Sequence, residues 1–539
     1  MIRKNFDRKI FFGGPIITLN DEQPIVEAVG VIGEKINSVG RLEYVKNTME
    51  SDYNLVNLNG STLLPGFIDC HLHPIIYAFY LMNPDLTNVN SLEDLKQVLK
   101  NASETKGEDE LLIGFNLKEE NFERPILPTK WDLDDASSTK PIFIMRYDGH
   151  IGIANTKALE LAGITYDSIA PEGGEIRKND KGDLTGIISE KALDLILSKI
   201  AFPGPQEIKG AAEQAFMILS EKGLTSLHGV LSTDTKGEFG GAAAVEMTIY
   251  KSLLDKIPQN WYALINTDKP KKLKQLKKPP LDDSTKESKF KINCLKLYLD
   301  GTFGAKTACM HEPFSDAPDM SGFCVVEEHE IYEKMKIAHN NGFQICVHAI
   351  GDKGNRILVD LFIKLLEEFP RENHRHRIEH ASMLTQDVIQ DMKKYGIIAS
   401  CQPPFLNSEY TWLEKRLGKE RLKYTYPFKS ITDAGVILAS GSDCPIEDPN
   451  PILGLHALIN RNGLVIEECI SIEEALKTYT LNAAYAAFEE DIKGSIEVGK
   501  LADMVILDRN PLEIPKDEIK DIQVVETIIR GKTVYKMQS

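Results

Sequence analysis

Four histidines, one aspartate and one lysine lie in short segments at the ends of apolar, strand-like runs. They are His71 and His73 in PGFIDCHLHP, Lys296 in NCLKLYLDG, His348 in FQICVHAIGD, His380 in HRIEHAS and Asp443 in VILASGSDCP. Imidazole and carboxylate groups bind divalent metal ions such as zinc, and a bound ion can activate water. These residue types therefore predict a metal-dependent hydrolase with the six residues as candidate ligands.

Strand alternation indicates which of these side chains can meet. His71 and His73 are separated by one residue, so both imidazoles point to one face of a strand and can bind one ion. The alternative is a pair of core histidines bonded to the backbone. Cys70 points to the opposite face, and we do not expect it to be a ligand.

Lys296 lies in the middle of CLKLYLD, in which leucines at 295, 297 and 299 occupy the opposite face. If this strand is buried on both faces, the lysine needs a strong partner, because an unpaired buried ammonium group is costly.

The elements that must position these residues are eight apolar, β-rich runs. They cover 66–71, 223–230, 261–267, 292–300, 343–350, 376–381, 396–402 and 436–442, and amphipathic helical stretches separate most of them. Strands that alternate with helices are typical of an α/β fold with a parallel sheet. Eight of them predict a TIM-like (β/α)8 barrel, whose strands deliver their last inward side chains to one rim.

The remaining segments predict two further units. Residues 1–64 and 487–539 read as short strands broken by turns, and we expect them to form one small composite β-sandwich domain. The barrel then covers 65–486. The gap of about 150 residues after the first run is too long for a loop, so 84–200 should be an inserted subdomain over the barrel mouth.

Bulk properties exclude several classes of function. The chain has 539 residues, 42% hydrophobic and 27% charged, as in a soluble globular protein. Its net charge of −17 argues against nucleic acid or an anionic membrane as a partner. We find no signal peptide and no membrane-length apolar run, so the expected location is the cytoplasm. The eight cysteines are expected to be buried free thiols.

At these residues the chain resembles the amidohydrolase superfamily, in the YtcJ-like (AepA-like) branch that includes N-substituted formamide deformylase. The resemblance extends nearly end to end. Its segments are PGFIDCHLHP, MRYDGHIGIANTKALELAGI, GGEIRKNDKGDLTGIISEKA, LKLYLDGTFGAKTA, RIEHASML, GSDCPIEDPNPILGLHALINR and LNAAYAA with GSIEVGKLADMVILD.

The resemblance implies roles for the candidate ligands. Asp443 would complete the shell of the ion held by His71 and His73, and would act as general base on its water and then as acid toward the leaving amine. His348 and His380 would hold a second ion, or donate to substrate in a one-metal site. Lys296 would be carboxylated and bridge two zinc ions; an unmodified Lys296 would instead pair with Asp300.

Other residues carry weaker expectations. His150 in the insertion is a candidate substrate contact, together with Arg146 and Asp300, although Arg146 and Asp148 could instead form a structural ion pair. His228 could line the pocket or fill the barrel, and His376 is expected just behind the metal ligands. The other histidines are expected at the surface or in packing: His311, His329, His339, His374 and His456.

The resulting prediction is a hydrolase of a carbon–nitrogen bond, other than a peptide bond, in a small amide, formamide or cyclic amide. The attacking group would be metal-activated hydroxide. An esterase or lactonase and a heterocycle deaminase are alternatives with the same site, and a catalytically silent scaffold is an alternative of another class. The expected partner is a small molecule, with a homodimer as the possible assembly.

Overall fold

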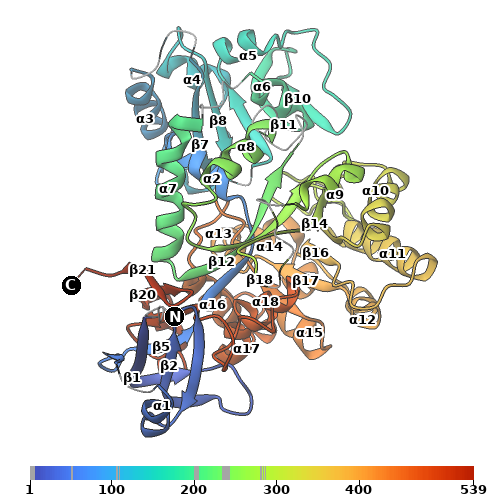
Figure 1. Ribbon diagram of the computed structural model, residues 1–539. Coiled ribbons are helices and arrows are strands. Elements are labelled where there is room, and N and C mark those ends of the chain that lie inside the picture. Colours follow the sequence, from blue (N-terminus) through green and yellow to red (C-terminus); the bar gives the residue numbers. More distant parts are fainter. Residues whose placement is uncertain are drawn as a thin grey trace.

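The computed structural model describes residues 7–49, 52–104, 107, 110–147, 149–199, 205–233, 243–278, 282, 285 and 287–538. Figure 1 shows three regions stacked along the long axis of the molecule. A sheet that contains strands from both ends of the chain lies at one end, the barrel lies in the middle, and the segment that follows the first barrel strand forms the other end.

The central region is an eight-stranded parallel sheet with helices around it, which confirms the predicted α/β barrel. All eight predicted runs form its strands, in sequence order. They are β6 (Phe67–Leu72), β12 (Leu224–Ser232), β13 (Asn260–Asn266), β14 (Phe290–Tyr298), β15 (Gln344–Ala349), β16 (Arg377–His380), β17 (Ile398–Cys401) and β18 (Leu438–Ser440).

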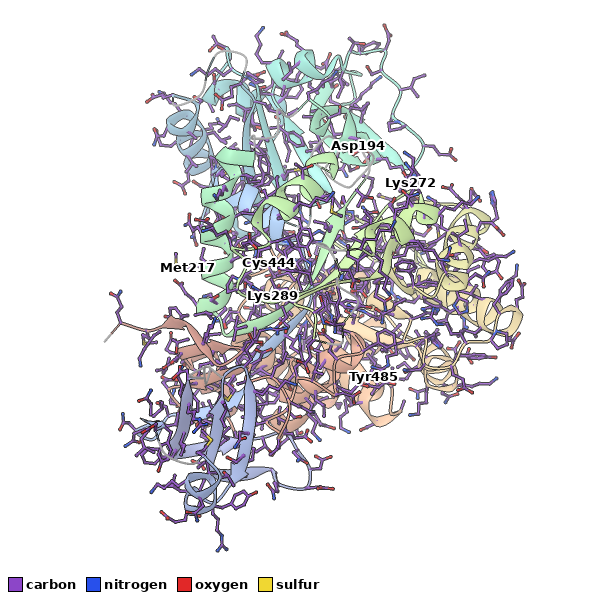
Figure 2. All side chains as sticks on the ribbon, viewed as in Figure 1. Asp194, Met217, Lys272, Lys289, Cys444 and Tyr485 are labelled. Atoms are coloured by element: carbon purple, nitrogen blue, oxygen red, sulfur yellow. A yellow bond between two sulfur atoms is a disulfide. The ribbon has the colours of Figure 1, made fainter. Side chains whose placement is uncertain are left out.

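Single backbone bonds close the barrel between its first and last strands. The sheet order runs from β18 to β6 without a ladder between those two strands. Beyond the end of β18, the amide of Asp443 donates to the carbonyl oxygen of His71 at 2.6 Å, and the carbonyl oxygen of Cys444 accepts the amide of His73 at 2.7 Å. These bonds hold three candidate site residues together, and Figure 2 shows Cys444 near the centre of the molecule.

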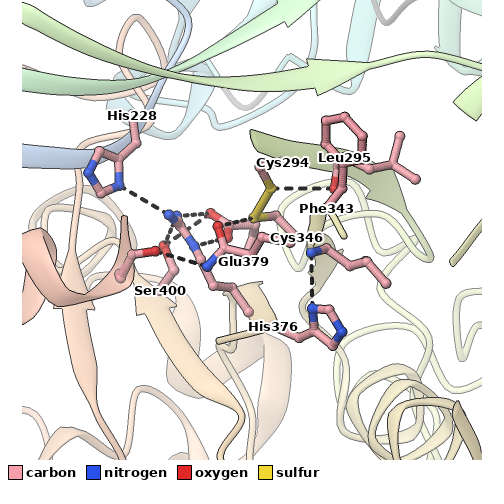
Figure 3. Close-up of a disulfide and its surroundings, with 12 residues drawn as sticks. His228, Cys294, Leu295, Phe343, Cys346, His376, Glu379 and Ser400 are labelled. Carbon is pink, nitrogen blue, oxygen red and sulfur yellow. Dashed lines mark hydrogen bonds and ion pairs between the residues drawn. A yellow bond between two sulfur atoms is a disulfide. The ribbon is translucent and has the colours of Figure 1, made fainter. Parts of the chain in front are cut away.

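The barrel interior contains a disulfide between Cys294 of β14 and Cys346 of β15 (Figure 3). The expectation that all eight cysteines are free thiols was wrong for this pair. Their Cα atoms are 6.7 Å apart because the two strands are neighbours in the sheet. Since the cysteines are 52 residues apart in the chain, the sequence alone offers no sign of the pairing.

Strands from both ends of the chain hydrogen-bond to one another in one continuous sheet. This sheet lies where we expected a composite β-sandwich. β5 pairs with β1 and β19, which joins the two ends. The boundaries of 1–64 and 487–539 stay a prediction. The strands are β1 (Arg8–Ile17), β2 (Ile25–Ile32), β3 (Lys35–Gly40), β4 (Asn54–Asn57), β5 (Thr62–Pro65), β19 (Met504–Leu507), β20 (Val524–Ile529) and β21 (Lys532–Lys536).

The segment after β6 has its own five-stranded sheet, in the order β10-β11-β9-β8-β7, at the upper end in Figure 1. A separate apolar cluster fills it, and the proposed boundary at 84–200 stays a prediction. The strands are β7 (Leu112–Leu117), β8 (Ile142–Arg146), β9 (Ile151–Ala154), β10 (Gly174–Lys178) and β11 (Leu184–Glu190).

Helices cover the outside of the barrel with one apolar face each. α11 buries Leu358, Leu361, Phe362 and Leu365, a spacing of three and four that places them on one side. None of the helices in the described ranges has the length and hydropathy to cross a membrane. The long helices are α3 (Leu92–Glu104), α7 (Pro205–Glu221), α8 (Ala243–Leu253), α10 (Glu328–Asn340), α11 (Asp352–Glu368), α12 (Gln386–Tyr395) and α16 (Pro451–Asn460).

The shorter helices lie mostly in connections. They are α1 (Leu42–Thr48), α2 (Pro74–Leu81), α4 (Lys130–Ala136), α5 (Thr156–Ala162), α6 (Asp194–Leu197), α9 (Leu273–Leu276), α13 (Phe405–Glu409), α14 (Leu413–Leu417), α15 (Phe428–Asp433), α17 (Ile472–Thr478) and α18 (Leu481–Ala486). α13 matters for the site, because it closes one wall of the cavity at the barrel mouth.

Candidate metal centre

His71, His73 and Asp443 meet at the carboxyl ends of the first and last barrel strands. Asp443 Oδ1 lies 3.4 Å from His71 Nε2 and 3.1 Å from His73 Nε2. Two ligands of one tetrahedral zinc ion, each about 2.0 Å from it, are separated by about 3.3 Å. Among the described residues, these three form the one group of at least three histidines, cysteines or acids whose ligand atoms all lie within 4.8 Å of one another.

The chemistry of this donor set fits a divalent ion. Asp443 Oδ1 is buried and accepts no hydrogen bond among the described residues, so it has lone pairs to offer. Burial, and then the positive charge of Lys296, hold the pKa of His71 well below its usual value, so the imidazole is neutral and able to bind metal.

Asp69 fixes the loop that carries Asp443. Its carboxylate accepts hydrogen bonds from the hydroxyl of Ser442 at 2.6 Å and from the amides of Ser442 and His71. Asp443 itself has a φ of +61°, a conformation that turns the chain sharply after β18. The carboxylate of Asp443 thus reaches the two histidines instead of continuing the strand direction.

Glu379 orients His71 from below. Its Oε2 accepts the hydrogen bond of His71 Nδ1, which leaves Nε2 toward Asp443. Arg377 and Ser400 also bind this carboxylate, at 2.7 Å and 3.0 Å (Figure 3). Glu379 was not among the predicted site residues. A carboxylate inside a buried strand is nevertheless a usable signal, because, like Lys296, it needs a strong partner.

His348 and His380 lie beside the first group. The ring centroids of His380 and His71 are 5.0 Å apart, and those of His380 and His348 are 4.4 Å apart. His380 Nδ1 donates to Gln402 Oε1 at 2.6 Å, and His348 Nε2 donates to the carbonyl oxygen of Gly301 at 3.2 Å. These bonds leave Nε2 of His380 and Nδ1 of His348 available to a ligand.

The orientation of His380 depends on its backbone. Arg377 and Glu379 of β16 point into the barrel, so strict alternation would direct His380 outward. His380 instead has a φ of +71°, and its ring joins the cavity wall. His376, which keeps the regular alternation, bonds to His339 at 2.8 Å and stacks on Phe362 of α11. The prediction that His376 lies just behind the metal ligands was therefore wrong.

Lys296 is completely buried and lines the same cavity. Its Nζ lies 4.5 Å from the centre of the Tyr298 ring, and its charge contributes to the lowered pKa of three of the candidate histidine ligands: His71, His348 and His380. The amine thus acts on three of the four candidate histidine ligands.

A cavity lies above these residues, and its empty space, including the part open to solvent, is about 730 Å³. The insertion contributes His150, whose Nδ1 lies 3.0 Å from Glu190 Oε2 and whose ring centroid is 6.0 Å from that of His348. The rest of the wall is largely aromatic and apolar, with one further acid. These lining residues are Tyr147, Tyr298, Phe303, Ile350, Phe405, Glu409, Tyr426, Pro445 and Ile446.

Two predicted substrate contacts do not line this cavity. Arg146 is buried in the insertion and forms ion pairs with Glu119, at 2.9 Å, and with Glu120. Asp300 accepts the backbone amides of Cys309, Ile350 and Gly351, so its carboxylate ties two loops together. Asp148 lies outside the described residues.

The remaining histidines have structural positions. His228 is buried in the barrel, and its Nδ1 lies 3.1 Å from a guanidinium nitrogen of Arg377 (Figure 3). Of the two predicted alternatives, lining the pocket or filling the barrel, the structure shows the second. His339 and His374 pack against His376. Tyr426 and Glu409, which share a 2.6 Å hydrogen bond in the cavity wall, were not anticipated, since they follow from no motif.

Known proteins match this chain along nearly its whole length. A model described as "Amidohydrolase family" matches residues 54–535. YtcJ of Bacillus subtilis (strain 168) is 30% identical, with 98% of this chain and 99% of that protein covered. The N-substituted formamide deformylase of Arthrobacter pascens is 25% identical, with 96% of each covered. The crystal structure of an uncharacterized metal-dependent hydrolase from Pyrococcus horikoshii OT3 has a TM-score of 0.74 and 28% identity, with 95% and 99% covered.

Proposed function

The chain belongs to the amidohydrolase family and is a metal-dependent hydrolase of that superfamily; on that premise we propose that it hydrolyses a carbon–nitrogen bond in a small amide, formamide or cyclic amide. The formamide deformylase of Arthrobacter pascens, 25% identical, supports this bond type. The fold alone would not, because barrels of this kind host many chemistries.

The observation that carries the proposal is the position of Asp443 Oδ1, within 3.4 Å of both His71 Nε2 and His73 Nε2. A divalent ion held by these three residues would supply Lewis acidity and an activated water. His348, His380 and Lys296 would hold a second ion if the Lys296 amine is converted to a carbamate, since a free ammonium group would repel a cation.

The chain's own residues handle the proton. Asp443 has its Oδ1 at the ligand group and its carboxylate at the cavity wall, so it can accept a proton there and return it to the leaving nitrogen. His150 lines the same cavity from the insertion, beside His348, and would hydrogen-bond the substrate carbonyl. Glu190 keeps its ring in place.

The cavity favours a small, largely apolar substrate. Its wall is mostly aromatic and apolar with a few polar groups, as in small-molecule sites, and rings such as Phe303, Phe405 and Tyr426 suit an aromatic or aliphatic substituent on the amide nitrogen. We therefore propose an N-substituted amide as the substrate class. Zinc as the metal, a homodimer as the assembly and the cytoplasm as the location stay predictions.

A panel of hydrolysis assays tests the proposal. Zinc-loaded protein would be given N-substituted formamides, cyclic amides, matched esters, lactones and amino-heterocycles, with amine, acid and ammonia measured as products. We expect amine release from one of the amide groups, and a loss of about 10²- to 10⁴-fold in kcat for Asp443→Asn. Turnover confined to esters, lactones or amino-heterocycles would contradict the proposed bond type, and no turnover with full metal loading would favour the scaffold.

A further inference from the structure

Outside the metal centre, a second pair of cysteines has its sulfurs in contact. Cys309 Sγ and Cys324 Sγ are 3.2 Å apart. Both lie in the connection between β14 and α10, and neither belongs to the Cys294–Cys346 disulfide. The two sulfurs are within about 1 Å of the length of a disulfide bond.

The backbone of Cys309 is fixed on the barrel side of the pair. Its amide donates to Asp300 Oδ2 at 2.9 Å, and its carbonyl oxygen accepts the amide of Gly354 at 3.0 Å. Asp300 also accepts the amides of Ile350 and Gly351, which directly follow β15. Cys309 is thus connected to the end of the strand that carries His348.

The backbone of Cys324 is fixed on the other side. The amide of Phe323 donates to Thr307 at 3.2 Å, and the amide of Val325 donates to Leu299 at 2.8 Å. Just before Phe323, Gly322 packs so closely that a Cβ there would lie 1.9 Å from the carbonyl oxygen of Ala308. The two sulfurs therefore meet because two anchored segments run side by side.

The two thiols are unequal in the way that a reactive pair requires. Cys309 is buried, whereas Cys324 is half-buried and accessible to a small reagent. The hydrogen bond that they share lowers the pKa of Cys324 and raises that of Cys309, and on Cys324 this effect outweighs burial and the charge of Asp300, which act in the opposite direction. An accessible thiolate beside a second cysteine is the arrangement found in redox-sensitive sites.

A structural metal is a poorer occupant of this pair. Zinc in proteins takes at least three protein ligands. In the described part of the chain, no histidine, cysteine or acid lies close enough to Cys309 and Cys324 to make a third ligand. The one group of three such residues with clustered ligand atoms there is His71, His73 and Asp443. Two thiols without a third ligand suit oxidation better than coordination.

We propose that Cys309 and Cys324 form a dithiol site that a peroxide converts reversibly into a disulfide. The Cys324 thiolate attacks one peroxide oxygen, the O–O bond breaks, and Cys324 becomes a sulfenic acid. The thiol of Cys309 then attacks that sulfur and gives its proton to the departing hydroxide, which leaves as water. In sum, two thiols lose two protons and two electrons, and hydrogen peroxide is reduced to two molecules of water.

The bond would tie the outer segment around Cys324 to the layer that supports His348. The same connection carries Thr302 and Phe303, which line the substrate cavity. Oxidation therefore fixes one wall of the cavity, and we expect the oxidised protein to resist proteolysis between residues 301 and 325 longer than the reduced protein does. Reduction by a dithiol reagent reverses both changes.

The test is a thiol count and a peptide map of the full-length, metal-loaded protein. Six of the eight cysteines are free thiols in the structure. After brief exposure to hydrogen peroxide and alkylation in denaturant, we expect four free thiols and a single new cross-link that joins the peptides of Cys309 and Cys324. Cys309→Ser should instead leave Cys324 as a sulfenic acid that a carbon nucleophile traps.

Cys469→Ser is the matched control, because Cys469 is another half-buried cysteine that lies in a different part of the fold. This variant should still lose two thiols and form the same link. An unchanged count of six in the wild type, a link between other cysteines, or protection of the pair by a metal that chelator removes would each overturn the proposal. The wild-type map is decisive even if a serine variant misfolds.

Discussion

Glu379 Oε2 accepts the hydrogen bond of His71 Nδ1 from inside the barrel, and this contact determines which nitrogen of His71 faces Asp443. A carboxylate behind a histidine ligand fixes its tautomer and increases its basicity. The contact therefore connects the packed interior of the barrel to the metal centre at its rim.

Glu379→Gln should weaken the metal centre without removing a ligand. The amide keeps an oxygen for His71 Nδ1 but leaves the buried guanidinium of Arg377 without its ion pair. We expect metal affinity to fall about 10- to 100-fold and the free energy of unfolding to fall by about 3 kcal/mol. Chelator competition and chemical denaturation measure the two effects. Ser400→Ala, which removes a hydroxyl that donates to Glu379 and accepts from Arg377 but keeps the ion pair, is the milder control; equal effects for both variants would contradict the assignment.

Lys296→Met should remove one of two bound ions and leave the other. Because Lys296 is fully buried among the histidines, methionine fills a similar volume but cannot form a carbamate. Metal-free wild type should also regain its second ion faster with bicarbonate than in carbon-dioxide-depleted buffer, whereas the variant should not respond. If the variant retains both ions, Lys296 is not the bridge.

His150→Asn should affect the substrate and not the metal. Its ring lies beside His348 without being part of the group of three around Asp443. We expect kcat/KM to fall about 10-fold or more through the loss of one hydrogen bond, with unchanged metal content. Glu190→Gln, which only loosens the ring, should have a smaller effect in the same direction. Loss of metal in His150→Asn would argue against a substrate role.

Acid should destabilise the protein partly through His374. Its Nε2 donates a hydrogen bond to the carbonyl oxygen of Tyr395, and its Nδ1 accepts one from the amide of His376. A proton added to Nδ1 would therefore face an N–H donor instead of an acceptor. Burial lowers the pKa of His374 to about 4. Since the unfolded chain binds this proton near pH 6.5, the stabilisation is complete above that pH and is lost toward pH 4, by about 3 kcal/mol.

His374→Gln should accordingly show a shallower dependence of unfolding free energy on pH between 6.5 and 4 than the wild type. His329→Gln replaces an exposed histidine and is the control, which should keep the wild-type slope. Denaturation of metal-free protein at several pH values measures both. Parallel curves for His374→Gln and wild type would contradict the assignment.

Much of the fold could be predicted because its signals are local. Each barrel strand is an apolar run between turns, and the pair His71 and His73 shows its common face through spacing alone. The bond between Glu379 and His71 joins residues 308 apart, and the turn of His380 into the cavity depends on a positive φ that no pattern indicates. Arg146 was expected to contact substrate or to pair with Asp148; its ion-pair partners Glu119 and Glu120 are 27 and 26 residues away in the chain and meet it only in the folded insertion.

The most direct test of the metal centre is metal content per chain, measured on protein purified without chelator, for the wild type and for His71→Asn/His73→Asn. The matched control is His311→Asn/His329→Asn, which changes two exposed histidines. We predict about two zinc-like ions in the wild type and the control, and loss of at least one in the His71/His73 variant. Equal metal content in all three proteins, or none in the wild type even after reconstitution with zinc, would contradict this metal centre.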